Sequence, residues 1–138
     1  KDSDFMFTAV YLPPIDSLYF SKDYFQTFDL ICDTFLRNYH FFAFRDFNSR
    51  IGTPDSPVYR SNPDSDINSH GKLLLDIIKK YDLSVVNGYS LNGVDFDSKF
   101  TFFRAEKRSQ IDFTICNAIE YVRSFYIKEI KEIKDSNL

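Results

Sequence analysis

Two polar side chains follow an apolar stretch in the first half of the chain, where a predicted strand ends. Residues 41–44 are three phenylalanines and an alanine, and Asp46 and Asn48 come shortly after them. Residues two apart in a strand point to the same side, so we expect the carboxylate and the amide to face one point. The carboxylate can take a proton from water and the amide can donate to a phosphoryl oxygen, which suits hydrolysis of a phosphate ester. The alternative is that both side chains only make local turns at the strand end.

Tyr11 stands at the carboxyl end of another strand, which is predicted over residues 5–12. Pro13 cannot donate to a β-ladder, so the strand has to stop there. Layered α/β proteins place their site residues at the carboxyl ends of strands. Tyr11 is therefore a candidate site residue, and the alternative is a tyrosine of the core or its rim.

Asp112 is the carboxylate of a third predicted strand, over residues 110–115. Ile111 and Phe113 face one side of this strand, so Asp112 faces the other. By itself this pattern also fits a half-buried strand with one solvated face.

The elements that would position these residues are two amphipathic helices and a series of strands. The first helix is predicted over residues 21–37, with Ser21 as its N-cap, and the second begins at Gly71. The stripes expected to face the core are Tyr24, Phe28, Ile31 and Phe35 in the first helix, and Leu74, Ile77, Ile78 and Tyr81 in the second. The remaining elements are a strand over 83–86 closed by an Asn87-Gly88 turn, strands over 100–104 and 110–115 joined by a charged turn at 105–108, a short helix over 117–121 and a strand over 124–133.

Residues 53–68 form a long polar loop in this interpretation. Asp64 and Asp66 have the opening spacing of a calcium-binding loop, but Ser69 and Leu75 occupy the positions that need a glycine and a bidentate glutamate. We therefore reject a calcium site and expect a mobile loop that touches a substrate. His70, which follows the loop, is expected to be a loop or capping histidine rather than a metal ligand.

Composition indicates a single globular domain over residues 1–138. There are 16 Phe and 9 Tyr residues, which predict a core built from aromatic rings, and a net charge of −3, which argues against binding nucleic acid by bulk charge alone. Cys32 and Cys116 lie in apolar surroundings, so we expect buried free thiols and an intracellular location, nuclear or cytoplasmic. No signal peptide or apolar run long enough for a membrane span is present in the sequence. Because the sequence opens directly on a strand, we expect it to be a segment of a longer protein.

Taken in order, the motifs of the chain resemble the endonuclease/exonuclease/phosphatase superfamily, specifically the endonuclease domain of non-LTR (LINE-type) retrotransposons. The match runs over nearly the whole chain. It is carried by Tyr11-Leu12-Pro13-Pro14, Asp46-Phe47-Asn48-Ser49-Arg50-Ile51-Gly52, Asn68-Ser69-His70-Gly71, Val85-Val86-Asn87-Gly88, Phe100-Thr101-Phe102 and Ser109-Gln110-Ile111-Asp112-Phe113.

The resemblance implies a DNase I-like fold, a four-layer α/β/β/α sandwich of two mixed sheets with helices outside. It also implies Mg²⁺ as cofactor and DNA as substrate, nicked to prime reverse transcription by an attached reverse transcriptase. Asp46 would orient or deprotonate the attacking water, and Asn48 would hold that water and the scissile phosphate. Asp112 would orient a catalytic histidine, as the triad aspartate does. Tyr11 would stand near the phosphate.

The same resemblance places Arg108 and Ser109 in a loop before the last conserved strand, where a contact to the nucleic-acid backbone is expected. The family's early Asn and metal-binding Glu, and its terminal Ser-Asp-His motif, have no counterpart in this chain, so its metal ligands stay unassigned. Arg45 stands where the family usually has glycine, and we expect it to crowd the site or to lower the basicity of a carboxylate.

We therefore expect a partial domain whose open sheet is covered by further segments or by a partner chain, and which is inactive on its own. The alternative is a catalytically inactive remnant that serves as a structural or interaction subunit of a larger assembly. A phosphatase acting on a small phosphoester or a lipid would share the chemistry, but the Arg-Ile-Gly and Asn-Gly surroundings favour the retrotransposon type.

Overall fold

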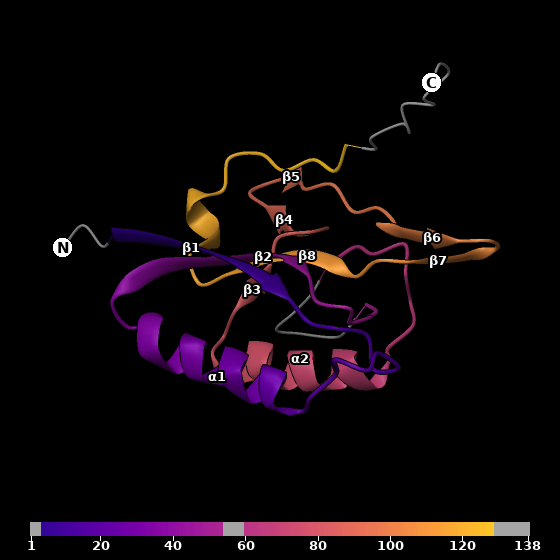
Figure 1. Ribbon diagram of the computed structural model, residues 1–138. Coiled ribbons are helices and arrows are strands. Elements are labelled where there is room, and N and C mark those ends of the chain that lie inside the picture. Colours follow the sequence, from indigo (N-terminus) through magenta and orange to yellow (C-terminus); the bar gives the residue numbers. More distant parts are fainter. Residues whose placement is uncertain (1–3, 54–59, 129–138) are drawn as a thin grey trace, which may run out of the picture.

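A computed structural model describes residues 4–53 and 60–128, and it shows a mixed α/β fold. The main sheet has the strand order β1-β2-β8-β3. Its strands are β1 (Asp4–Tyr11), β2 (Tyr39–Asp46), β8 (Asp112–Cys116) and β3 (Ser84–Val85). β1 and β2 run parallel, whereas β8 is antiparallel to both of its neighbours. The helices α1 (Asp23–Phe35) and α2 (Ser69–Lys80) cover one face of this sheet (Figure 1).

Smaller elements extend the fold beyond the sheet. Two hairpins are present, β4 (Ser90–Leu91) with β5 (Val94–Asp95) and β6 (Phe102–Arg104) with β7 (Lys107–Ser109), and a 3₁₀ turn spans Ile119–Tyr121. The β4–β5 hairpin lies on the side of the sheet opposite to the helices, and the β6–β7 hairpin projects from one end of it (Figure 1). Among the described residues, no helix is long and apolar enough to cross a membrane.

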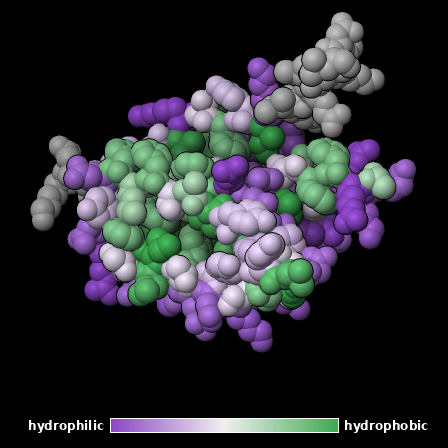
Figure 2. All heavy atoms as spheres, in the orientation of Figure 1, coloured by the Kyte–Doolittle hydropathy of each residue, from purple (hydrophilic) through white to green (hydrophobic). Residues whose placement is uncertain are grey.

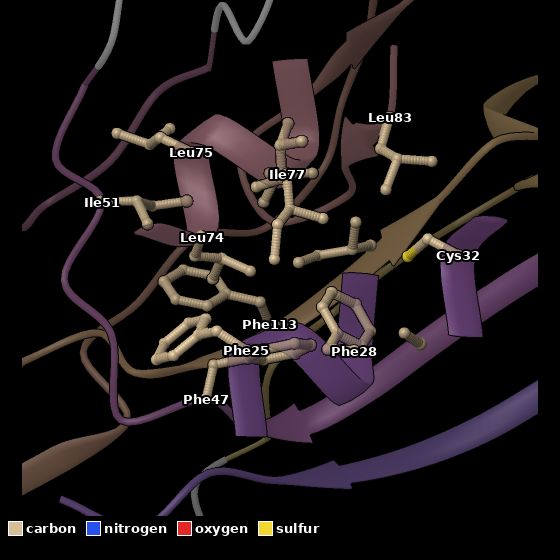
Figure 3. Close-up of a cluster of buried hydrophobic side chains, with 14 of the residues drawn as sticks. Phe25, Phe28, Cys32, Phe47, Ile51, Leu74, Leu75, Ile77, Leu83 and Phe113 are labelled. Carbon is tan, nitrogen blue, oxygen red and sulfur yellow. The ribbon is translucent and has the colours of Figure 1, made fainter. Parts of the chain in front are cut away.

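The core lies between the two helices and the sheet, and aromatic rings fill much of it (Figure 3). Phe28 from α1 packs edge-on against Phe47 at a centroid distance of 5.6 Å, and Phe47 in turn packs against Phe113 of β8. Cys32 and Cys116 are buried free thiols, as predicted. Burial raises the pKa of Cys32 to about 12 and that of Cys116 to about 11, so both side chains act as small apolar groups.

The other face of the sheet is only partly covered. Phe5 and Phe7 are 48% and 65% exposed, and Phe44 of β2 is exposed as well. Strand periodicity explains this pattern, because alternate residues of β1 turn away from the helices. Figure 2 shows apolar side chains gathered at the left of the view, near the β1 end of the molecule. The exposed rings of Phe5, Phe7 and Phe44 are called the open aromatic face below.

The first helix differs in detail from the prediction. It begins at Asp23 after Lys22, and Ser21 accepts a hydrogen bond from the Asp23 amide at 3.2 Å without being the cap residue. Its fully buried positions are Phe25, Phe28 and Cys32, whereas Tyr24 is exposed. The predicted stripe was therefore wrong at its first residue. Phe25 and Cys32 lie at helical spacing from Phe28, as Tyr24 also does, so spacing alone does not tell which of them faces the core.

The second helix is close to its prediction. Leu74, Ile77 and Ile78 are buried, and the N-cap is Asn68, whose side-chain oxygen accepts from the Gly71 amide at 2.7 Å. The same oxygen accepts from the Arg50 amide at 3.0 Å. Asn68 therefore ties the start of α2 to the segment that follows β2.

The strands near the end of the chain differ from the predicted pair over 100–104 and 110–115, because a further strand, β7, begins within the predicted turn. The 102–104 strand pairs with β7 and not with the 110–115 segment, and β8 instead joins the main sheet between β2 and β3. Residues 122–128 contain no strand, and residues 129–133 of the predicted last strand lie outside the described part of the chain. Three-residue strands such as β6 and β7 are too short for alternation alone to identify.

Hydrogen bonds tie residues 60–68 to other elements, whereas the sequence predicted a mobile loop over 53–68; residues 54–59 lie outside the described residues. The Arg50 guanidinium donates to both carboxylate oxygens of Asp64, at 2.9 and 2.7 Å. The backbone N–H of Gln110 donates to the same carboxylate at 2.9 Å. Arg60 is buried beside them and donates to the side chain of Gln110 and to the Asn87 carbonyl. We call Arg50, Arg60, Asp64 and Gln110 the buried polar network.

Candidate active site

Three of the predicted site residues come together in one row across the sheet. Tyr11 is the parallel partner of Asp46, and Asp46 is the antiparallel partner of Asp112. Residues that are directly opposite in neighbouring strands point to the same face. Tyr11, Asp46 and Asp112 therefore form one row on the face away from the helices, which we call the carboxylate row.

The two carboxylates of the row are close neighbours. The Phe47 amide donates to the Ile111 carbonyl at 3.0 Å, so the adjacent pair of Asp46 and Asp112 belongs to the non-hydrogen-bonded type. In such a pair the Cα atoms are about 4.5 Å apart and the side chains approach closely. Burial raises the pKa of Asp46, and the negative charge of Asp112 raises it further. Asp46 is thereby made a better proton acceptor.

Asn48 does not continue the strand, so the predicted two-residue alternation fails at this point. Its φ of 44° lies in the left-handed region, and its backbone N–H donates to Asp46 Oδ1 at 2.9 Å. Its side-chain Nδ2 donates to the Leu12 carbonyl at 2.8 Å. The turn that we gave as the alternative is therefore present, and it links the ends of β1 and β2.

Arg45 also has an unusual backbone, with a φ of 110°. Side chains are rarely tolerated in this region, and glycine adopts it without strain. The charge of Arg45 lowers the pKa of Asp46, against the larger effect of burial. This direction matches the expectation that a cation at this position reduces the basicity of the site.

Two residues that sequence reasoning missed hold β8 in place. Asn87 donates to the Asp112 carbonyl at 3.1 Å and accepts from the Thr114 amide at 2.9 Å, so its side chain acts as an extra link of the ladder. Thr101 accepts from the Ile111 and Asp112 amides, both at 3.1 Å. From the sequence the Asn87-Gly88 pair is interpreted only as a turn, and no local pattern indicates that the Asn87 side chain is buried.

Arg108 and Ser109 lie on β7 and differ from each other in exposure. Arg108 is exposed, whereas Ser109 is buried in the hairpin. Within the described part of the chain, Ser109 is linked to Thr101, whose backbone N–H donates to the Ser109 carbonyl at 2.9 Å, and not directly to the carboxylate row. The connection is indirect, because Thr101 precedes β6 and holds the Asp112 amide.

The two histidines lie away from the row. His40 packs against Phe5 and Tyr121 near the opposite end of β2, at centroid distances of 5.1 and 4.5 Å. His70 is buried between Phe20 and Phe25. Over residues 4–53 and 60–128, Asp112 therefore has no histidine to orient.

No protein-family model matches the chain, and searches of the curated proteins and of the solved structures gave no match either.

Proposed function

We propose that the chain is part of a Mg²⁺-dependent endonuclease that nicks DNA, of the LINE-type retrotransposon kind, in which a reverse transcriptase uses the nick. The observation that carries this proposal is the carboxylate row of Tyr11, Asp46 and Asp112. On this one sheet face a phenol can donate a hydrogen bond to a phosphoryl oxygen, and a carboxylate can take a proton from the water that attacks the phosphorus.

In this proposal Asp46 takes the proton from the attacking water. Its raised pKa supports this role, because a more basic carboxylate accepts a proton more readily. Tyr11 is exposed and its hydroxyl donates to a phosphoryl oxygen. The charge of the neighbouring Asp112 raises the pKa of Asp46 and so adds to its basicity. Asn48 acts mainly through its turn, which holds Asp46 in place.

DNA as the substrate is supported by the β6–β7 hairpin. Arg104, Lys107 and Arg108 are exposed there, and Phe102 and Phe103 present rings to solvent. Cations that contact phosphates together with rings that stack on bases are the usual means of binding nucleic acid. Local charge of this kind compensates for the acidic balance of the whole chain.

The four-layer sandwich is also part of the proposal. The structure has two of the layers, a mixed sheet and the helices on one face. The open aromatic face would receive a second sheet, supplied by a further segment or by a partner chain, because large exposed apolar patches are usually covered. This second layer would also bring the catalytic histidine to Asp112.

Mg²⁺ does not fit the described residues by themselves. No three His, Cys, Asp or Glu side chains come together anywhere in residues 4–53 and 60–128. No metal ligand is therefore assigned among these residues. When bound, Mg²⁺ would neutralise the charge that develops on the phosphate.

The second candidate is a catalytically inactive remnant with a structural role. It is favoured by Arg45, which lowers the pKa of Asp46, and by the lack of a histidine beside Asp112 among the described residues. In this candidate function the open aromatic face is the surface that binds other subunits, and the carboxylate row is a remnant of an ancestral active site without activity.

A nicking assay on supercoiled plasmid, with Mg²⁺ or with a chelator, tests the proposal. We expect no nicking by the 138-residue chain alone, because the row lacks a general acid and metal ligands. Restoring the sequence that flanks the chain in its gene should give Mg²⁺-dependent nicking, lowered at least about 1,000-fold by Asp46→Asn. The matched control is Asp95→Asn, on the β4–β5 hairpin, which should leave the rate unchanged. A folded but silent longer protein would favour the remnant.

A further inference from the structure

β1 is an edge strand whose outer side is unpaired in the described part of the chain. It is the first strand in the order β1-β2-β8-β3, and β2 is its only ladder partner among residues 4–53 and 60–128. It is long for an edge, with 8 residues in regular register, and it contains no proline or charged residue between Phe5 and Tyr11. Native edge strands are usually short, charged or kinked, because an open edge invites pairing with another strand. The outer edge of β1 has none of these protections.

The alternation of the parallel ladder shows which backbone groups of β1 point outward. The Leu12 N–H donates to the Asp46 carbonyl at 2.9 Å, so the even-numbered positions bond to β2. The N–H and C=O groups of the odd-numbered residues therefore point away from β2. These residues are Phe5, Phe7, Ala9 and Tyr11. Their side chains lie on the face away from the helices, where Phe5, Phe7 and Tyr11 are 48%, 65% and 63% exposed.

The sequence of β1 is close to self-complementary about Thr8. If two copies pair antiparallel with this residue at the centre, Phe5 lies opposite Tyr11 of the second copy. Phe7 then lies opposite Ala9. Residues at such positions exchange two hydrogen bonds across the ladder, so every outward N–H and C=O of the odd-numbered residues finds a partner. A register shifted by two residues would carry one end of each strand past the end of the other.

The side chains favour the same pairing. The rings of Phe5 and Tyr11 would meet across the two strands, and aromatic cross-strand pairs stabilise a sheet. On the other face Met6 and Val10 would meet beside the core, which both of them already contact. Asp4 stands at the start of the strand and does not face its own counterpart in this register, so no like charges oppose each other.

We propose that β1 pairs antiparallel with β1 of a second copy, across a two-fold axis at Thr8, and joins the two sheets into one continuous sheet. The interface is isologous, since both copies use the same edge. Each copy brings its Phe5 ring against Tyr11 of the other, at the end of the carboxylate row. Another strand would also fit an open edge, but the symmetry of the β1 sequence about Thr8 favours a second copy. The pairing uses only groups of β1 and is independent of the proposed DNA cleavage.

Sedimentation equilibrium of the 138-residue chain over a dilution series tests the proposal, with Phe7→Lys as the disrupting variant. The substitution places two lysines near the two-fold axis, where charge opposes the pairing of edge strands. The Phe7 side chain is exposed, so the fold of the single copy should persist. We expect the unmodified chain to form a dimer and Phe7→Lys to raise the dissociation constant at least about 100-fold. A monomeric unmodified chain would overturn the proposal.

Val94→Lys is the matched control. It places the same charge on β5, at an apolar residue that is 52% exposed, and it should leave the dissociation constant unchanged. An equal loss of the dimer in Val94→Lys and Phe7→Lys would overturn the proposal, because the effect would then come from charge in general and not from the edge of β1.

Amide hydrogen exchange on the unmodified chain distinguishes this dimer from any other and keeps the test decisive if Phe7→Lys fails to fold. In a single copy only the even-numbered residues of β1 bond to β2 and are protected, whereas the proposed dimer also protects Phe7 and Ala9. We expect slow exchange at these two amides that is lost on dilution. A dimer in which both exchange rapidly would overturn the proposal. Neither measurement depends on DNA cleavage, so failure of the proposed function and failure of this inference are distinguishable.

Discussion

Gly71→Ala should unfold the protein or lower its free energy of unfolding by about 3 kcal/mol or more. A Cβ at this position would lie 1.8 Å from the Arg50 carbonyl oxygen. A shift of α2 away from Arg50 would break hydrogen bonds, because the Asn68 side-chain oxygen accepts from the backbone N–H groups of both Gly71 and Arg50, at 2.7 and 3.0 Å. Urea denaturation followed by circular dichroism measures the loss.

Gly93→Ala is the matched control for this substitution. Gly93 has a φ of 80° and no atom within 4 Å of the added Cβ, so only backbone strain opposes the change. We expect a cost of about 1–2 kcal/mol from strain alone. A Gly71→Ala protein as stable as the Gly93→Ala protein would contradict the close contact between α2 and the Arg50 carbonyl.

Asp64→Ala should cost about 3 kcal/mol at pH 7, because it breaks the buried polar network. The substitution leaves the buried backbone N–H of Gln110 without its acceptor, and it removes the carboxylate that faces the guanidinium of Arg50. Asp66→Ala is the control, since Asp66 binds the same arginine at 2.8 Å but its side chain is 66% exposed against 2% for Asp64. We expect a cost below about 1 kcal/mol for Asp66→Ala. Equal losses in the two variants would contradict a role for burial.

The pH dependence of stability provides a second readout for Asp64. Burial acts to raise its pKa, but the hydrogen bonds from Arg50 and from the Gln110 and Asp66 amides hold it below the ordinary value. A carboxyl group with a depressed pKa in the folded state stabilises the protein above the unfolded pKa of about 3.9. This contribution disappears as the pH falls through the folded-state pKa. The difference in stability between the unmodified protein and Asp64→Ala should therefore shrink as the pH falls below about 4.

The sheet could be predicted from the sequence because the strand period is short and regular. β1 and β8 were expected close to their observed bounds, and the placement of Phe113 and Asp112 on opposite faces followed from alternation. The second helix was equally clear, because its apolar residues recur at helical spacing. Element type was therefore readable wherever the pattern was long.

The pairing of short segments and the long-range contacts could not be read in the same way. β8 pairs with β2 and β3, which lie far away in the chain, and no local pattern specifies such partners. The buried polar network joins Arg60 to Gln110, fifty positions further on. The polar segment that contains Arg60 looked like a mobile loop because its partners lie in other elements.

The candidate site was predicted in part. Tyr11, Asp46 and Asp112 were each singled out, and the register of the strands brings them into one row. Asn48 was placed incorrectly in the strand, since the hydrogen bond from its amide to Asp46 Oδ1 favours a turn over a further extended residue. Local competition of this kind is typical of Asp and Asn at strand ends.

The carboxylate row can be tested most directly by titrating the ¹³C- and ¹⁵N-labelled chain with a short DNA duplex. Chemical shifts of the Tyr11 ring and of the Asp46 and Asp112 carboxyl carbons report on binding at the row. We predict that the three signals shift together with one midpoint, and that exposed residues of the β6–β7 hairpin shift with them. DNA binding that moves other signals and leaves these three unchanged would contradict the account.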